Sequence, residues 1–155
     1  MNIIDKQSGK KKLFTAIMLA SSLLLSACGE PSQPKKAPLS QYTQQGKTYL
    51  AQFQFKAAIV AAKNAIVAYP EQIDGYLVLA KIYLQLEEPE ISTQILKQYK
   101  NDKTADYYFL LLEAYQKNNK LISANKLLKA ESTLLQQQPN RLKKEQAKIL
   151  LHERK

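Results

Sequence analysis

An internal repeat constrains the fold of this 155-residue chain more than any other feature of its sequence. The repeat is marked by the tyrosines Tyr49, Tyr83 and Tyr115, which recur at nearly even intervals. Small residues keep the same register at Ala58, Ser92 and Ala124. A period of roughly 34 residues, with apolar residues at helical spacing inside each unit, is typical of stacked helical hairpins. The sequence therefore predicts an all-α fold built from paired helices.

The first unit shows both helices of such a hairpin. Tyr42, Gly46 and Tyr49 lie four and three residues apart, so they share one face of a helix. A second stripe of helical spacing follows at Phe55, Ala58, Ala62 and Ala65. Pro70 ends this second helix, because proline lacks the amide donor that a helix interior needs. The small residues predict that the two helices approach closely.

The three units resemble the tetratricopeptide repeat (TPR), whose loose pattern combines aromatic, leucine, small and proline positions. The first copy matches at Tyr42, Gly46, Tyr49, Phe55, Ala58, Ala65 and Pro70. The second copy matches at Tyr76, Leu79, Ala80, Tyr83, Leu86, Ser92 and Leu96, and the third at Tyr108, Leu111, Tyr115, Leu121, Ala124 and Leu128. The resemblance implies a right-handed superhelical TPR solenoid of about three helical hairpins, spanning residues 39–72, 73–104 and 105–139.

A last helix is expected after the third hairpin, where Pro139 is predicted to break the chain. From Arg141 onward, an apolar face lies opposite a polar one. The apolar face holds Leu142, Gln146, Ile149 and Leu150, and the polar face holds Arg141, Lys144, Glu145 and Lys148. Such a helix can cover the exposed end of a solenoid. We therefore expect residues 140–155 to form a basic capping helix and tail.

Residues 1–27 resemble a bacterial lipoprotein signal peptide. Basic residues at Lys6, Lys10, Lys11 and Lys12 precede the mainly apolar residues 13–25, which are too few for the roughly 20 that a membrane-spanning helix needs. The following Leu25-Ser26-Ala27-Cys28 resembles the lipobox, which implies cleavage before Cys28 and covalent lipid on its thiol. The alternative is an uncleaved membrane-anchor helix in which Cys28 is incidental.

Residues 28–38 are predicted to be a tether, since Pro31, Pro34 and Pro38 favour extended chain. Lys35 and Lys36 in this stretch either contact anionic lipid or only keep the tether solvated. By resemblance to Gram-negative lipoproteins, Gly29 in place of an aspartate after the cysteine implies the periplasmic face of the outer membrane.

The composition argues against an enzyme. The chain has one cysteine and one histidine, which excludes disulfide frameworks, zinc-finger spacings and Cys/His or Ser/His catalytic pairs in the repeats. Gly46-Lys47-Thr48 has the letters that end a phosphate-binding loop, but Gln41 replaces the required earlier glycine. His152 has no second ligand nearby for a metal. We expect no catalytic residue, no metal and no cofactor apart from the lipid on Cys28.

The TPR resemblance also implies a concave, partner-binding groove on the first helices of the hairpins. The residues implied to face it are Thr43, Lys47, Leu50, Leu77, Lys81, Leu84, Phe109, Glu113, Gln116 and Lys117. Lys47 and Lys81 occupy equivalent positions, so we expect a groove for an extended, partly acidic peptide. The alternative is a solvated helix face. Chaperone-binding relatives clamp a terminal carboxylate with a lysine and an asparagine, and Thr43 with Lys47 does not reproduce that pair.

The net charge of +10 suggests two further kinds of partner to consider, namely acidic polysaccharide or lipid and nucleic acid. The basic residues 141–155 suit acidic polysaccharide or anionic lipid, against the alternative of a solvated capping helix. Nucleic acid is not expected, because an envelope address removes that partner and no motif interleaves aromatic residues with these charges.

The first copy, from Phe55 to Ile66, directly behind a lipobox and a Pro-rich tether, resembles the opening of TPR lipoproteins of PEP-CTERM and exopolysaccharide export systems. This resemblance implies a protein-binding scaffold in a cell-envelope assembly. The alternatives are a pilotin-like lipoprotein that assists a secretin or pilus, and a structural protein that contacts acidic glycans.

Overall fold

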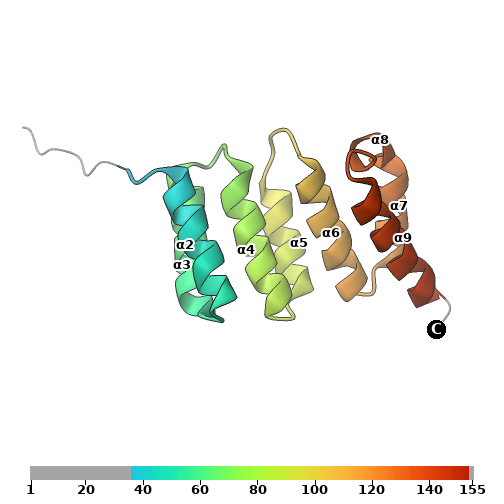
Figure 1. Ribbon diagram of the computed structural model, residues 1–155, viewed down its shortest axis with the longest axis horizontal. Helices are drawn as coiled ribbons and strands as arrows, with labels where there is room; N and C mark the ends of the chain where they lie inside the picture. Colours follow the sequence, from blue (N-terminus) through green and yellow to red (C-terminus); the bar gives the residue numbers. More distant parts are fainter. Residues whose placement is uncertain (1–35, 154–155) are drawn as a thin grey trace, which may run out of the picture. The chain divides into compact units, whose positions relative to one another are not determined.

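The computed structural model describes residues 36–153, and only the backbone of residues 152 and 153. Within this range every regular element is an α-helix, which confirms the all-α class (Figure 1). The helices are α2 (Leu39–Ala51), α3 (Phe55–Ala68), α4 (Ile73–Gln85), α5 (Pro89–Gln98), α6 (Ala105–Lys117), α7 (Leu121–Ala130), α8 (Ser132–Leu135) and α9 (Pro139–Glu153). None of these helices is long and apolar enough to cross a bilayer. The predicted signal peptide and Cys28 lie outside the described residues.

The helices of residues 36–153 form two layers. Each of α2 to α7 packs against the next one in the chain, and α2, α4 and α6 also contact one another in order (Figure 1). The contacts of α6 with α9 extend this row by one helix. The helices of the row begin at residues 39, 73, 105 and 139, so α9 keeps the period of the repeat. It therefore takes the place of a fourth first helix.

Small side chains set the distance between the layers. Ala58, Ser92 and Ala124, which share one position of the repeat, are each 0% exposed. Gly46 fits as closely, since a Cβ there would lie 2.9 Å from Val78 Cγ1 and 3.7 Å from the carbonyl oxygen of Ala58. The expected close approach of α2 to α3 is thus observed, and Gly46 also brings α4 near.

The turn after each first helix repeats in atomic detail. Phe53, Glu87 and Asn119 follow α2, α4 and α6 with φ of 58°, 58° and 53°, the left-handed region. The next residue in each turn donates its N–H to a tyrosine carbonyl 2.8 Å away, at Tyr49, Tyr83 and Tyr115. This is the Schellman arrangement, which satisfies carbonyls that a helix end leaves free. The repeating tyrosines therefore mark the last turn of each first helix.

Pro139 begins α9 instead of separating it from the third hairpin. The first residue of a helix has no intrahelical partner for its N–H, so proline is well tolerated there. The predicted start at Arg141 is two residues late. The short α8, between α7 and α9, is not predicted from the sequence, and its Leu135 is fully buried.

The face that α9 presents to α6 differs from the expectation. Arg141, Glu145 and Ile149 lie four residues apart on one face, and Glu145 is 6% exposed although the sequence pattern places it on the polar side. Leu150, expected on the apolar side, is 58% exposed. The carboxylate of Glu145 accepts a hydrogen bond from Lys148 Nζ at 2.8 Å through one oxygen, while the other oxygen has no partner among the described residues.

The end of the predicted tether is part of the folded unit. Lys36 Nζ donates a hydrogen bond to the carbonyl oxygen of Ala68 at 2.7 Å and lies 5.6 Å from the centre of the Tyr69 ring. The Tyr69 hydroxyl donates to the carbonyl oxygen of Ala37 at 3.0 Å. Residues 36–38 are therefore held against the C-terminal end of α3.

Candidate protein-binding groove

A groove of about 490 Å³ runs across the helix row of α2, α4 and α6 and reaches the first turn of α9. Its lining residues are Lys47, Leu50, Ala51, Asp74, Leu77, Val78, Lys81, Gln85, Asp106, Leu110, Glu113 and Arg141. The groove exists because these four helices keep one register, which brings equivalent positions of successive units side by side.

The floor of the groove is apolar. It is formed by Leu50 and Ala51 of α2, Leu77 and Val78 of α4, and Leu110 of α6. Leu50, Val78 and Leu110 also belong to the core that joins the first three hairpins, so the floor is held rigidly from behind. A rigid apolar surface of this kind gains free energy by burial against a ligand without the cost of ordering itself.

Charged side chains lie on both sides of the α4 and α6 part of this floor, in two rows. Asp74 and Asp106, in the first turns of α4 and α6, form the Asp74 row. Their carboxylates lie where the helix dipole favours negative charge. Lys47, Lys81 and Glu113, at equivalent positions of α2, α4 and α6, form the Lys47 row. Two turns of helix separate the rows.

The charges of the groove balance. Three acidic side chains, Asp74, Asp106 and Glu113, face three basic ones, Lys47, Lys81 and Arg141. The expectation of a partly acidic ligand rests on the two lysines; it includes Glu113 among the groove residues but not the two aspartates. A ligand that complements this groove has to carry both signs of charge in a defined order.

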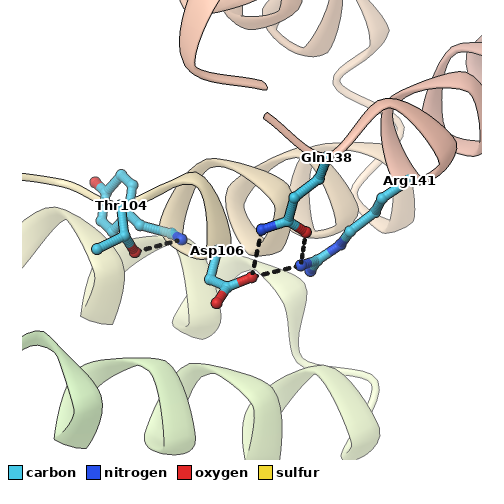
Figure 2. A network of polar contacts seen from close by, with 5 residues as sticks. Thr104, Asp106, Gln138 and Arg141 are labelled. Carbon is cyan, nitrogen blue, oxygen red and sulfur yellow. Dashed lines mark hydrogen bonds and ion pairs between the residues drawn. The ribbon is translucent and has the colours of Figure 1, made fainter. Parts of the chain in front are cut away.

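Arg141 lines the groove at its α9 end, and Figure 2 shows its side chain pointing to Asp106, beside Gln138. Its Nη1 lies 2.6 Å from Asp106 Oδ1, and Gln138 contributes a longer hydrogen bond of 3.4 Å to the same oxygen. The guanidinium also lies 4.3 Å from the centre of the Phe109 ring. At the start of the same helix as Asp106, Thr104 Oγ1 accepts a hydrogen bond from the Tyr107 N–H at 3.4 Å, an N-cap that anchors this end of α6.

Half of the residues expected to face the groove do so. The structure brings together Lys47, Leu50, Leu77, Lys81 and Glu113. The two lysines are exposed, as a ligand-binding role requires, and neither forms an ion pair with any described residue.

Three of the expected groove residues are instead buried beside it. Thr43 is 7% exposed, and its hydroxyl donates back to carbonyl oxygens of the preceding turn of α2. Leu84 is 2% exposed in the main core. Phe109 is 1% exposed because Arg141 covers its ring and α9 packs beside it. The sequence prediction assumes that equivalent positions of all three first helices face the groove. It does not include the packing of α9 on α6, which buries Phe109.

The remaining two expected residues form contacts within the fold. Gln116 is 6% exposed and donates a hydrogen bond to the carbonyl oxygen of Glu145 at 3.5 Å, linking α6 to α9. Lys117 lies 2.9 Å from Glu87 in the preceding turn. Neighbouring elements of the fold, and not a shift of helix face, therefore take these two side chains away from the groove.

A polar link between neighbouring turns includes this Lys117 pair. Glu90, at the start of α5, accepts hydrogen bonds from Lys120 Nζ at 2.8 Å and from the Asn118 side chain. The hydrogen bond from Lys120, followed by that from Asn118, lowers the pKa of the Glu90 carboxyl below its ordinary value of 4.5. The second and third hairpins are thus joined by charge at their turns as well as by the core.

Sequence reasoning missed three charged groove residues, Asp74, Asp106 and Arg141, and also the groove residues Ala51, Val78, Gln85 and Leu110. The two aspartates recur at the same interval as Tyr83 and Tyr115, and this signal could have identified them. Arg141 gave no such signal, because its role follows from the approach of α9 to α6.

No family model, curated protein or solved structure matches this chain. Among the described residues, no group of three or more cysteine, histidine, aspartate or glutamate side chains is arranged to hold a metal ion. Cys28 and the side chain of His152 lie outside the described residues.

Proposed function

We propose that this protein is a binding scaffold whose groove holds an extended segment of a partner protein. The observation that carries the proposal is the apolar floor across α2, α4 and α6, which charged rows border on both sides along α4 and α6. An extended chain lying across parallel helices can bury apolar side chains on the floor and pair its charges at the edges.

We infer that the hairpins form a TPR-type solenoid. Three features support this: the helix starts at residues 39, 73, 105 and 139 keep a nearly constant period, the turns repeat at Phe53, Glu87 and Asn119, and the small residues Ala58 and Ala124 hold equivalent buried positions. The first helix of each pair lines the groove, as in a solenoid that binds on its concave side.

We further propose that the scaffold is a lipoprotein, anchored through Cys28 at the periplasmic face of the outer membrane and acting in an envelope assembly such as exopolysaccharide export. The support is the lipobox-like Leu25-Ser26-Ala27-Cys28 behind a short apolar run. Several acyl chains hold a protein at a membrane essentially permanently.

Metabolic labelling with radioactive palmitate tests the anchor. The mature wild-type chain is expected to carry label, and a Cys28→Ser variant is expected to carry none and to leave the membrane fraction. Unlabelled wild-type protein that still fractionates with membranes would favour the uncleaved anchor helix and overturn the lipoprotein proposal.

Site-specific photo-crosslinking in intact cells tests the groove. A photoreactive residue in place of Lys81 is expected to capture a partner protein, which mass spectrometry identifies. The matched control places the same residue at Lys63, which is also exposed but lies on α3 in the other helix layer. Capture of the same proteins from both positions, or from Lys63 alone, would contradict a partner seated in the groove.

A further inference from the structure

One face of α4 presents an acidic, an apolar and a basic residue to the groove. Asp74, Leu77 and Lys81 of α4 all line the groove and are spaced three and four residues apart. One face of a single helix therefore presents, in order, an acid, an apolar residue and a base. The distance from Asp74 to Lys81 is about 10 Å along the helix axis, since each residue advances about 1.5 Å.

The spacing between helices matches one extended conformation in particular. Packed helices lie about 8–10 Å apart, and α2, α4 and α6 are in direct contact in that order (Figure 1). A polyproline II chain repeats every three residues and advances about 9 Å per turn. Each turn of such a ligand thus meets one helix. On α4 and α6, one residue of the turn lies toward each charged row and one toward the floor. A β-strand repeats every two residues, about 7 Å, and loses this match after one helix.

The charges of the Lys47 row change sign along the groove. From α2 to α6 the row reads Lys47, Lys81 and Glu113, and none of the three forms an ion pair with a described residue. Opposite them, Asp106 is already paired with Arg141, whereas Asp74 forms no ion pair with a described residue. The Lys47 row therefore has three charges available to a ligand and the Asp74 row has one.

From this geometry we infer that the groove recognises a polyproline II segment with two acidic residues and one basic residue at successive third positions, separated by apolar residues. The inference rests on the proposed function and adds the chemical class of the partner. The acidic residues pair with Lys47 and Lys81, the basic residue pairs with Glu113, and the intervening apolar residues lie on Leu77 and Leu110. The order of charges, and not the net charge, distinguishes this ligand from others.

Peptides of identical composition test the order. Fluorescein-labelled peptides are built from Glu-Leu-Pro and Lys-Leu-Pro triplets and titrated with the full chain in detergent micelles, with fluorescence anisotropy as the readout. Two peptides carry the triplets as acid, acid, base and as base, acid, acid, because the rows do not fix the direction of the ligand. The third carries acid, base, acid. We expect one of the first two to bind at least about fivefold tighter than the third, since several exposed pairs change sign.

A charge-exchange variant tests directly whether the order of charges in the Lys47 row determines which peptide binds. Lys81→Glu combined with Glu113→Lys keeps the net charge of the protein and changes the order of the Lys47 row. This variant is expected to prefer the acid, base, acid peptide. The matched control exchanges charges outside the groove, Lys63→Glu with Glu88→Lys, and is expected to keep the wild-type preference.

Each outcome decides the inference separately from the proposed function. Equal binding of all three peptides, or no binding, overturns the charge order, and so does an unchanged preference in the Lys81 and Glu113 variant that retains its helical circular dichroism. A partner captured at Lys81 but not at Lys63 in the crosslinking experiment would still support the binding scaffold in those cases.

Discussion

The guanidinium group of Arg141 lies 4.3 Å from the centre of the Phe109 ring while the same group forms a 2.6 Å ion pair with Asp106. One side chain of α9 thus covers the Phe109 ring of the groove helix α6 and neutralises the charge of Asp106 beside it. The contact joins α9 to the row and also fixes where the groove ends.

Arg141→Ala is therefore expected to weaken the attachment of α9. A partly exposed cation over an aromatic ring and an exposed ion pair together contribute about 1–2 kcal/mol. Urea unfolding followed by circular dichroism measures the loss. Arg141→Lys keeps the charge next to Asp106 without the planar stacking, so about half of the loss is expected. Wild-type stability in both variants would show that the contact does not hold α9.

Alanine at the two described glycines is expected to give unequal losses of stability. In both cases the higher helix propensity of alanine stabilises the folded state by about 1 kcal/mol, which offsets part of any steric cost. At Gly46 the new Cβ meets only the tip of Val78 closely, at 2.9 Å, so the net change is small. At Gly75 it meets the backbone nitrogen of Ile66 at 3.1 Å as well as side chains, and a net loss of about 1–2 kcal/mol is expected. Chemical denaturation of both variants measures the difference, and a larger loss at Gly46 would contradict it.

Phe53 holds a backbone conformation that suits asparagine better. Its φ of 58° is unfavourable for a bulky residue, and its side chain is 74% exposed. Phe53→Asn is expected to be more stable than Phe53→Ala by about 1 kcal/mol, because both lose the ring contact with Phe55 and only asparagine tolerates the left-handed region well. Differential scanning calorimetry of the pair checks this, and equal melting temperatures would remove the backbone explanation.

Replacement of Glu145 by leucine is expected to stabilise the protein. The carboxylate is buried, and one of its oxygens has no partner among the described residues. The equivalent positions of α4 and α6 hold Leu79 and Leu111, which are buried in the core. Replacing a poorly satisfied buried charge with a well-packed apolar group gains about 1–3 kcal/mol. Glu145→Ala, which leaves a cavity, is the control and should gain less; a destabilised leucine variant in urea unfolding would oppose the expectation.

The link at Glu90 predicts a pH dependence of stability. Its pKa is lowered in the folded protein, so the stabilisation is fully present above the ordinary value of 4.5 and is lost as pH falls through the lower folded value. Glu90→Gln is expected to flatten the acid limb of a plot of melting temperature against pH. Glu88→Gln, at a neighbouring exposed glutamate with no ion pair among the described residues, should leave that limb unchanged. Identical acid limbs for wild type and Glu90→Gln would count against the link.

The sequence was sufficient to predict the paired helices of the three repeats, although not α8, because each pair carries its own signals. The period of Tyr49, Tyr83 and Tyr115 follows from the repeated turn in which their carbonyl oxygens accept a hydrogen bond. The closeness of α2 to its neighbours follows from Gly46. These are local requirements that a single chain displays at fixed spacing.

The groove could be predicted only in part, because its edges depend on which helices meet. Lys47, Lys81 and Glu113 follow from the register alone. The sequence pattern places Arg141 on the polar side of a capping helix. Periodicity within one helix cannot show that Asp106 and Phe109 of the neighbouring helix lie next to this side chain. The burial of Glu145 is missed for the same reason: a glutamate in a helical pattern is expected to face water.

The bonds of Lys36 and Tyr69 determine how mechanical load would enter the domain. A pull on the N-terminal segment first meets the hydrogen bonds from Lys36 to Ala68 and from Tyr69 to Ala37, which cross from the start of α2 to the end of α3. Tension is therefore shared by both helices of the first hairpin before either begins to unravel. A domain that remains folded while it is held by one end gains from this arrangement, because the strain stops at its first pair of helices.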